Sequence, residues 1–195
     1  MKILLLVLFI YSLLTYKVTN PSKVEISKWV ISENSSLVVN GSTNVNHFSC
    51  RVVHYSMDTI KLSQDDVRQT LSGNILIEVK SFECNIQMMT KELRKTLNES
   101  EFPILHINLL SLKQVSVTNM GGLFKGNVEI EIAGKAKNFV GVYELAKHKD
   151  KMVFKGTQSV NFSDFELKPP VKVGRLIKAK DGLTIVFTLI LRKVK

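Results

Sequence analysis

The chain has 195 residues, of which 45% are hydrophobic and 23% are charged. These proportions exclude an intrinsically disordered chain and are typical of one globular domain that buries its own core. Lysine and arginine outnumber aspartate and glutamate by 27 to 17, which gives a formal net charge of +10. The basic residues are spread along the chain and not clustered on one helix among aromatic residues, which argues against a nucleic-acid-binding protein. Their spread indicates a solvated basic exterior, which would favour approach to an anionic membrane surface.

The N-terminus has the pattern of a targeting segment. Lys2 precedes a predominantly apolar run from Ile3 to Leu14. A basic start followed by an apolar stretch too short to span a bilayer is typical of a secretory signal peptide, which we expect to occupy residues 1–20. An uncleaved anchor is the alternative. Removal of the segment would lower the net charge from +10 to +8, and would leave a single domain, residues 21–195, in the periplasm or outside the cell.

The chain after residue 20 consists mostly of short segments in which apolar and polar residues alternate, as expected of strands with one buried face. The first is Trp29–Ser32, and Ser36–Asn40 and His47–Ser56 follow after polar turns. The segment Met57–Gln69 is polar and shows no period, so we predict a connecting loop there. Alternation resumes in Asn74–Lys80, where Ile75, Ile77 and Val79 share one face.

One segment changes to the period of a helix. Between Ile86 and Leu97 the apolar residues form a single helical stripe, with charged residues on the opposite side. Asn85 is the candidate N-cap, and Asn98 is the candidate stop. The Phe102–Pro103 pair then forces an extended chain, because proline disfavours the α region for the residue before it. We predict an amphipathic helix that closes one end of the β structure, with its apolar stripe, Met89, Leu93 and Leu97, pointing inward.

The chain from Ile104 onward again predicts strands. They are Ile104–Leu110, Leu112–Val117, Val128–Gly134, Phe139–Ala146, Met152–Phe162 and Leu183–Lys193, with turns at Asn119–Gly122, His148–Asp150 and Asp181–Gly182 and a loop or sheet edge around Pro169–Pro170. Eight or more strands with one helix predict an all-β, antiparallel barrel of about eight strands, because closure removes the edges that apolar strands would expose.

Cys50 and Cys84 are the only cysteines of the chain. In an exported protein an even count is first interpreted as a disulfide, and this pair would close a loop of about 33 residues. Two reasons support the disulfide: the expected export of the protein, and the similar sequence around the two cysteines, each of which lies two residues after a phenylalanine. Two independent buried thiols are the alternative. Neither cysteine has a C-x-x-C partner, which argues against redox catalysis and thiolate metal sites.

No known catalytic or nucleotide-binding motif is present in the sequence. His54 and His106 lie in predicted strands and could meet across a barrel, but isolated histidines of this kind are more often ordinary core or surface residues than metal ligands. The aspartates form no pair that would act as acid and base. The sequence therefore predicts a non-enzymatic protein without a metal or cofactor, and a hydrolase or metalloenzyme is the weakest of the interpretations.

Four segments resemble the YceI-like family, and their order and spacing along the chain agree with that family as well. They are the strand, M-x-x-x-L helix and F-P-I-L-H-I strand of Ser72–Leu112, the G-S-T-N-V-x-x-F-x-C stretch within Trp29–Cys50, the hairpin Val128–Val142 and the D-F-x-x-x-P-P segment within Asp164–Lys178. Together they extend from about Trp29 to Lys193. The resemblance implies a secreted, lipocalin-like barrel associated with binding of polyisoprenoids and other lipids.

On this interpretation the protein holds a long-chain lipid in an apolar cavity between the helix and the strands. The residues we expect to line the cavity, from the inward face of each element, are Phe48, Ile75, Ile77, Val79, Met89, Ile104, Phe139 and Phe187. An error of one residue in register would move the residues of a whole strand to the outside. The alternative is an accessory envelope protein whose barrel is filled by its own side chains and which acts through protein contacts.

Overall fold

The structure is a computed structural model that describes residues 24–53, 56, 58–65, 69–118, 121–172 and 176–194. The expected signal peptide and His54 lie outside the described residues. The strands are β1 (Glu25–Ile31), β2 (Ser36–Thr43), β3 (His47–Val52), β4 (Thr59–Gln64), β5 (Gln69–Glu78), β6 (Phe82–Cys84), β7 (Ile104–Thr118), β8 (Gly121–Ile132), β9 (Lys135–His148), β10 (Lys151–Asn161), β11 (Val171–Lys172) and β12 (Ile177–Lys193). The helices are η1 (Val79–Ser81), α2 (Gln87–Thr96) and η2 (Phe162–Phe165).

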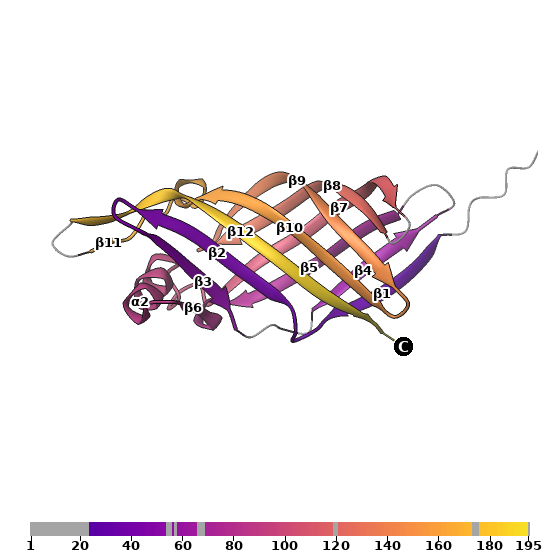
Figure 1. Cartoon of the computed structure of the whole chain (residues 1–195), viewed down its shortest axis with the longest axis horizontal. Helices are drawn as coiled ribbons and strands as arrows, with labels where there is room; N and C mark the ends of the chain where they lie inside the picture. The colour runs from indigo at the N-terminus through magenta and orange to yellow at the C-terminus, as the bar shows by residue number, and fades with distance from the viewer. Residues whose placement is uncertain are drawn as a thin grey trace, which may run out of the picture.

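The strands form an antiparallel barrel (Figure 1), which confirms the predicted fold class. Hydrogen-bonded neighbours follow the order β1-β4-β5-β7-β8-β9-β10-β12, and pairing of β12 with β1 closes a ring of eight strands. In the ring, Trp29 is opposite Lys193 and Ile31 is opposite Leu191. Ring closure satisfies the backbone groups of strands that would otherwise be sheet edges.

A second set of strands lengthens the barrel at one end. β2 continues along the edge of β12 where β1 stops, so that β1 pairs with residues 191–193 and β2 with residues 179–188 of this strand. β3 pairs with β2 and β6 with β3, and within the last pair Cys50 is opposite Cys84. α2 follows β6 and lies at this end, whereas the C-terminus lies at the other end (Figure 1). We call these the α2 end and the C-terminal end.

The predicted disulfide is confirmed. Cys50 and Cys84 are bonded, with a sulfur–sulfur distance of 2.00 Å, and the described residues contain no free cysteine. Cys84 is the last residue of β6 and comes just before α2. The bond therefore ties the start of the helix to β3 in the barrel wall.

The helix extends over Gln87–Thr96, close to the predicted range, but its N-terminus differs from the expectation. The N-cap is Ile86, which makes no side-chain cap, so the prediction of Asn85 as the cap is wrong. Instead, the Thr90 hydroxyl accepts a hydrogen bond of 2.9 Å from the backbone N–H of Cys84. The stop at Asn98 is confirmed, because this residue follows the helix with a φ of 53°, a left-handed conformation that asparagine tolerates.

The predicted loop Met57–Gln69 is wrong in its middle part, which forms β4 (Thr59–Gln64). Ile60 and Leu62 of β4 are 0% and 1% exposed. They alternate with polar residues. Two apolar positions are too few to identify a strand from the sequence, because acidic residues follow directly. Pairing with β1 on one side and β5 on the other supplies the backbone hydrogen bonds of this strand.

Two other predicted boundaries change because strands run on through expected breaks. The segments Ile104–Leu110 and Leu112–Val117 form one strand, β7, with register shifts after Leu109 and Gln114. β12 begins at Ile177, and the expected turn at Asp181–Gly182 is a register shift within it. Such bulges bend a strand without ending it. The hairpin between β8 and β9 is confirmed, and its turn consists of Ala133 and Gly134, both with positive φ.

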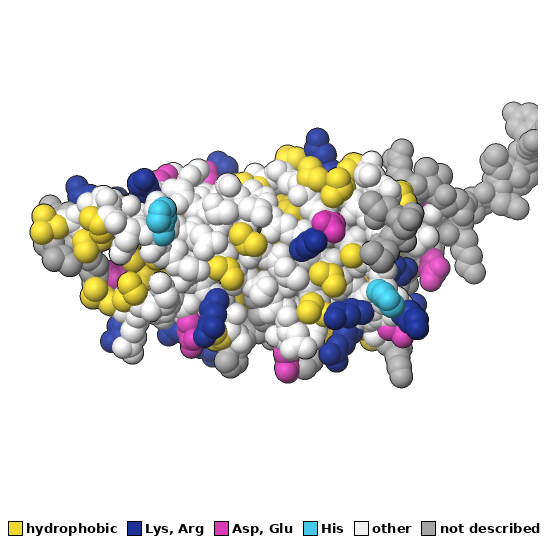
Figure 2. All heavy atoms as spheres, in the orientation of Figure 1, with side chains coloured by type: hydrophobic (Ala, Val, Ile, Leu, Met, Phe, Trp, Pro, Cys, Tyr) yellow, Lys and Arg dark blue, Asp and Glu magenta, His cyan; other side chains and the backbone are white. Residues whose placement is uncertain are grey.

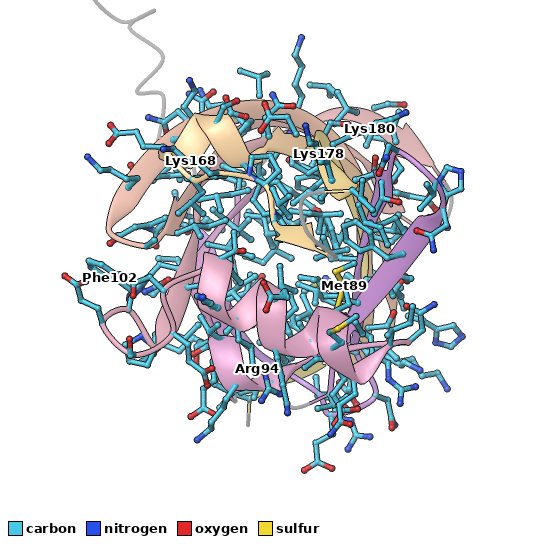
Figure 3. The ribbon with its side chains drawn as sticks, turned by 90° about the vertical axis from the view of Figure 1, so that its left-hand side faces the viewer. Met89, Arg94, Phe102, Lys168, Lys178 and Lys180 are labelled. Atoms are coloured by element: carbon cyan, nitrogen blue, oxygen red, sulfur yellow. A yellow bond between two sulfur atoms is a disulfide. The ribbon has the colours of Figure 1, made fainter. Side chains whose placement is uncertain are left out.

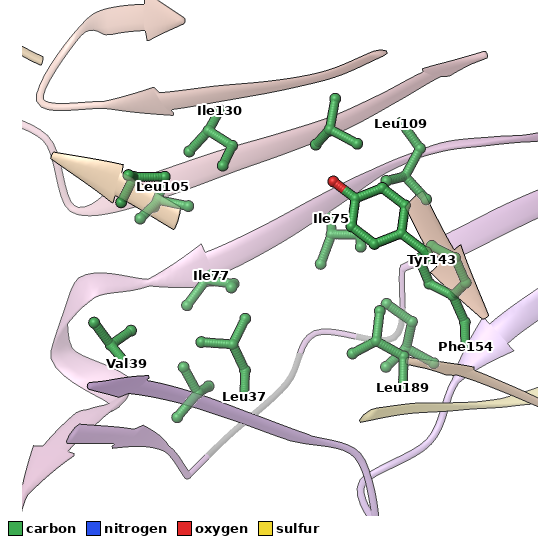
Figure 4. Packing of buried hydrophobic residues seen from close by; sticks show 14 of the residues in the cluster. Leu37, Val39, Ile75, Ile77, Leu105, Leu109, Ile130, Tyr143, Phe154 and Leu189 are labelled. Carbon is green, nitrogen blue, oxygen red and sulfur yellow. The ribbon is translucent and has the colours of Figure 1, made fainter. Parts of the chain in front are cut away.

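The core fills the barrel interior with the inward side chains of nearly every strand (Figure 4). The most completely buried large side chains include Trp29, Leu71, Leu112, Phe124 and Leu191, each 0% exposed. Strand pairing places Trp29 beside Ile60, and Leu71 beside Leu112. No helix within the described ranges is long and apolar enough to cross a membrane.

Candidate functional site

The barrel interior is not completely filled. A cavity of about 50 Å³ lies among inward side chains of β2, β5, β7, β8, β9, β10 and β12. It is lined by Leu37, Ile75, Ile77, Ile107, Leu109, Val128, Ile130, Tyr143, Phe154, Gln158, Ile185, Phe187 and Leu189. Figure 4 shows Leu37, Ile77, Ile75 and Tyr143 arranged around the same space. We call this space the barrel cavity, and its wall is apolar except at Tyr143 and Gln158.

Three aromatic rings form one side of the barrel cavity. The ring centroids of Tyr143, Phe154 and Phe187 lie 5.3–5.6 Å apart in tilted or edge-on arrangements, which are favourable for aromatic pairs. Two glycines make room for them. A Cβ on Gly141 would lie 2.0 Å from the Tyr143 hydroxyl, and one on Gly156 would lie 2.5 Å from the Tyr143 ring. The tyrosine ring therefore lies flat against the bare backbone of two strands.

Tyr143 also bridges a separation in the wall. β9 and β10 pair only between residues 144–148 and 151–155, and their register does not continue toward the α2 end. Across this separation the Tyr143 hydroxyl donates a hydrogen bond of 2.8 Å to Oε1 of Gln158. Burial raises the pKa of the Tyr143 phenol above its ordinary value. The phenol thus stays a neutral hydrogen-bonding group within an apolar wall.

Beyond Tyr143, side chains join β9 to the segment after β10. Lys137 pairs with Asp164 at 3.6 Å, and Lys135 pairs with Glu166 at 2.8 Å. The rings of Phe139 and Phe165 are also in contact, with centroids 6.2 Å apart. η2 therefore closes the separation between β9 and β10 by side-chain contacts, where a continuous sheet would use backbone hydrogen bonds.

A second cavity, of about 90 Å³, lies at the α2 end. We call it the mouth cavity. It is lined by Thr43, Asn46, Phe48, Ile86, Met88, Met89, Glu92, Pro170, Ile177 and Ala179. Figure 3 looks into this end, with Met89 on the helix facing the space enclosed by the strands. Both cavities lie along β2 and β12: Leu37 and Ile185 line the barrel cavity, and Thr43 and Ala179 line the mouth cavity.

α2 is fixed across this end by its apolar stripe and by one arginine. Leu93 and Leu97 are 4% and 5% exposed, and Met89 packs against the same core. Arg94 donates hydrogen bonds to the backbone carbonyls of Lys80 and Phe82, the latter at 3.0 Å. The sequence pattern placed Arg94 on the solvent side, whereas its guanidinium anchors the helix to the connection between β5 and β6. The prediction that the stripe of the helix points inward is confirmed.

The residues expected to line one cavity are distributed over two. Ile75, Ile77 and Phe187 line the barrel cavity, whereas Phe48 and Met89 line the mouth cavity. Val79 is buried within η1, outside the lining of both cavities. Phe139 is half-buried against Phe165 and also lies outside both linings.

The predicted inward orientation of Ile104 is wrong. Its side chain is 40% exposed, and its neighbour Leu105 is 7% exposed and belongs to the core. Both faces of β7 carry apolar residues near this point, so alternation alone cannot assign them. The partner strand decides, because Leu105 is opposite Ile77, whose side chain is inward.

Sequence reasoning missed Tyr143, Phe154 and Gln158 as cavity residues. The isolated glycines in β9 and β10 were the available signal, since a glycine within a strand marks a close approach of another group. Gly141 and Gly156 mark where the Tyr143 ring lies.

The histidines were the sequence's candidates for a metal site. His106 is half-buried on β7, opposite Glu131 of β8, and its expected partner His54 lies outside the described residues. The part of the chain that the structure describes contains no cluster of histidine, cysteine and acidic side chains that could hold a metal ion. The arrangement of Tyr143 and Gln158 can orient a ligand by hydrogen bonds, and the surrounding wall can bury apolar surface.

Comparisons with known proteins agree with this geometry. Comparison with curated protein sequences gave no match. Among solved structures, BcnA of Burkholderia cenocepacia is similar with a TM-score of 0.62 and 16% identity, over 80% of this chain and 95% of that chain. A polyisoprenoid binding domain from Saccharophagus degradans, implicated in plant cell wall breakdown, has a TM-score of 0.58 and 10% identity, over 87% of this chain and all (100%) of that chain. The YceI protein of Campylobacter jejuni has a TM-score of 0.51 and 18% identity, over 75% and 84% of the two chains. The sequence itself matches the YceI-like domain over residues 22–190, so the chain belongs to the YceI-like family.

Proposed function

We propose that the protein is an exported, non-enzymatic binding protein that holds a long-chain lipid, isoprenoid or fatty-acid-like, inside the barrel. The observation that carries the proposal is the apolar cavity in the barrel interior, in line with the mouth cavity at the α2 end. A long aliphatic chain has few directional groups and is held by burial, at about 0.8 kcal/mol per methylene. A dozen methylenes would contribute about 10 kcal/mol before the entropic cost of ordering the chain. The likeness to a polyisoprenoid binding domain supports this ligand class.

The cavities are smaller than such a ligand. Volumes of about 50 and 90 Å³ compare with roughly 300–1,000 Å³ for pockets that hold drug-sized molecules. Binding therefore requires that side chains move and that the two cavities join. The inward residues Ile107, Ile185 and Phe187 are only half-buried, and Met89 has a flexible, unbranched side chain. We infer that these residues give way to the lipid chain, while Tyr143 and Gln158 remain as hydrogen-bonding groups beside it.

Export is supported by the disulfide and by the N-terminal sequence. Disulfides persist in the periplasm and outside cells and are rare in the reducing cytosol. The bond between Cys50 and Cys84 is therefore consistent with the signal-peptide pattern of residues 1–20. Periplasmic location would also place the barrel beside membranes, which are the source of isoprenoid and fatty-acid chains.

The small volume of the barrel cavity favours one alternative, an accessory protein with a filled barrel. An eight-stranded barrel is just wide enough to be filled by its own side chains or to hold one small ligand. Such a protein would act through its outer surface. Exposed apolar residues on β7, β8 and β9 provide one candidate contact surface, formed by Val115, Val117, Leu123, Val140 and Val142.

Mass spectrometry of the protein purified under native conditions separates the two functions. The binding function predicts a co-purifying lipid with a long apolar chain, released on denaturation. Ligand-free protein that also fails to bind long-chain isoprenoid and fatty-acid probes would favour the filled barrel.

A charge placed in the cavity tests the site directly. Ile77 is 2% exposed and lines the barrel cavity, so Ile77→Glu should abolish probe binding. Asn74→Glu is the matched control, because Asn74 is exposed on the same strand. Ile185→Phe fills the cavity without adding a charge and serves if Ile77→Glu does not fold. Fluorescence of the single tryptophan, Trp29, which is 0% exposed, reports the fold. Undiminished binding in a folded Ile77→Glu or Ile185→Phe variant would contradict this location.

A further inference from the structure

The surface around the mouth cavity is unusually apolar for an exposed rim. Five exposed hydrophobic residues belong to the segments that line the cavity or adjoin its lining: Val45, Ile86, Met88, Val171 and Leu176, which are 43–72% exposed. We call them the apolar rim. Figure 2 shows hydrophobic side chains reaching the surface at this end of the molecule, on the left. The rim comes from the β2–β3 turn, α2 and the β11–β12 hairpin, which are distant in sequence.

One asparagine, Asn44, joins two of these segments, the β2–β3 turn and the start of β12. Asn44 donates a hydrogen bond of 2.9 Å from Nδ2 to the carbonyl of Leu176, and its Oδ1 accepts one of 2.9 Å from the N–H of Lys178. The backbone N–H of Asn44 also donates to the carbonyl of Lys178, at 3.0 Å. The β2–β3 turn and the start of β12 therefore form one surface and present Val45 and Leu176 together.

Lysines accompany the apolar rim. Lys168, Lys178 and Lys180 are exposed, and Figure 3 shows them on the side of this end opposite α2. Salt bridges within the described part of the chain involve none of these three. Of the acidic groups nearby, Glu92 faces the mouth cavity, and Asp181 accepts hydrogen bonds from the backbone and hydroxyl of Ser163. The cationic groups that face outward are thus available to an anionic partner.

We propose that the α2 end of the barrel docks on an anionic lipid bilayer, with the apolar rim in the interfacial region and Lys168, Lys178 and Lys180 against the lipid phosphates. Exposed aliphatic side chains flanked by lysines are the combination that binds anionic bilayer surfaces. A second copy of the chain fits less well, because two such rims would bring like charges together. The inference rests on the proposed function for its purpose: docking would place the mouth cavity where a lipid chain can pass from the bilayer into the barrel.

Vesicle partition of the full chain tests the charge requirement. The vesicles contain phosphatidylcholine alone or an equal mixture with phosphatidylglycerol. The triple variant Lys168→Gln/Lys178→Gln/Lys180→Gln removes the charges at the α2 end. Lys147→Gln/Lys149→Gln/Lys151→Gln is the matched control, because these three exposed lysines surround the β9–β10 turn at the C-terminal end. Each lysine near an anionic surface raises the partition coefficient about fivefold. The partition coefficient of the first variant for the mixed vesicles should therefore fall roughly a hundredfold.

A fluorescent reporter identifies the end that touches the bilayer. A bimane is attached to the folded, oxidised protein at Leu176→Cys or, as control, at Lys149→Cys. The emission should shift to the blue on mixed vesicles only at the first position. Equal losses in both triple variants, a shift at Lys149→Cys instead, or equal binding to neutral vesicles would each overturn the proposal. Absence of vesicle binding would also overturn it and would favour a protein partner for the same rim.

The outcome can be separated from that of the lipid-binding function. The triple variant at the α2 end leaves the barrel cavity unchanged, so it should bind a detergent-solubilised isoprenoid probe as the unmodified protein does. If the probe does not bind to either protein but the Leu176→Cys reporter responds to vesicles, docking stands and the lipid-binding function fails. If the probe binds to both proteins and the Leu176→Cys reporter does not respond to vesicles, the lipid-binding function stands and docking fails.

Discussion

Loss of the disulfide should destabilise the protein by an amount that follows from its sequence separation of 34 residues. In the chain-entropy description a cross-link removes loop-closure entropy from the unfolded chain, and a loop of this length corresponds to about 4 kcal/mol at 25 °C. For a domain of this size, 1 kcal/mol changes the melting temperature by about 2–4 °C. We therefore expect reduction to lower the melting temperature by about 8–16 °C.

The assay compares oxidised and reduced protein in thermal and urea unfolding followed by Trp29 fluorescence. Cys50 is 0% exposed, so the protein is reduced while unfolded and then refolded in reductant. The Cys50→Ala/Cys84→Ala variant controls for incomplete reduction and should unfold near the reduced protein. Labelling of denatured, non-reduced protein should detect no free thiol. If the free energies of unfolding of the reduced and oxidised proteins differ by less than about 1 kcal/mol, the entropic reasoning is refuted. Two labelled thiols would refute the bond itself.

Two further substitutions test the helix and the cavity wall. Leu93→Ala should lower the free energy of unfolding by about 2–5 kcal/mol, because it removes a buried side chain and leaves a cavity, while Lys95→Ala on the exposed side should change it by less than about 0.5 kcal/mol; equal small losses in urea midpoint would show that α2 does not close the barrel. Tyr143→Phe removes the hydrogen bond to Gln158 and should cost about 1 kcal/mol at neutral pH. The folded state holds the pKa of Tyr143 above its unfolded value, so the stability contributed by the neutral phenol is present below about pH 10 and lost as the pH rises further. The difference between the two proteins should therefore narrow above about pH 10, and a constant difference would contradict the raised pKa.

The architecture could be predicted because most strands show alternation of apolar and polar residues in their own sequence. Alternation in β5 identifies Ile75 and Ile77 as inward, and both are buried. The helix could be recognised from the change of period, and the disulfide from an even number of cysteines together with the signal-peptide pattern. The strand and helix signals are local, so no knowledge of the partner strands is needed for them.

The wrong predictions concern residues whose orientation or strand assignment depends on pairing with another strand. Ile104 and Leu105 are both apolar, and only the register with Ile77 assigns Leu105 to the interior. β4 has two buried residues, and its existence depends on neighbours on both sides. The separation between β9 and β10 is defined by their pairing, which stops at Glu144 and Lys155. The cavity lining depends on such features, which is why sequence reasoning identified the fold better than the site.

The distribution of packing explains how one barrel can be both stable and adaptable. Toward the C-terminal end of the barrel the inward residues Trp29, Leu112 and Phe124 are each 0% exposed. These residues make the largest contribution to stability, because a tightly packed interior penalises any loss of volume. Farther along the same strands toward the α2 end, β12 carries Ile185 and Phe187, which face the interior but remain half-buried.

On the proposed function, side chains at that end would move while the fully buried contacts near the C-terminal end remain in place. The wall there is secured by bonds between its neighbouring elements: the disulfide between β3 and β6, the hydrogen bonds of Arg94 to the β5–β6 connection, and the ion pairs between β9 and the η2 region. None of the side chains that form these bonds lines the barrel cavity or the mouth cavity. If the barrel takes up an apolar ligand as proposed, the half-buried side chains would give way to it while the packed residues near the C-terminal end keep the fold intact.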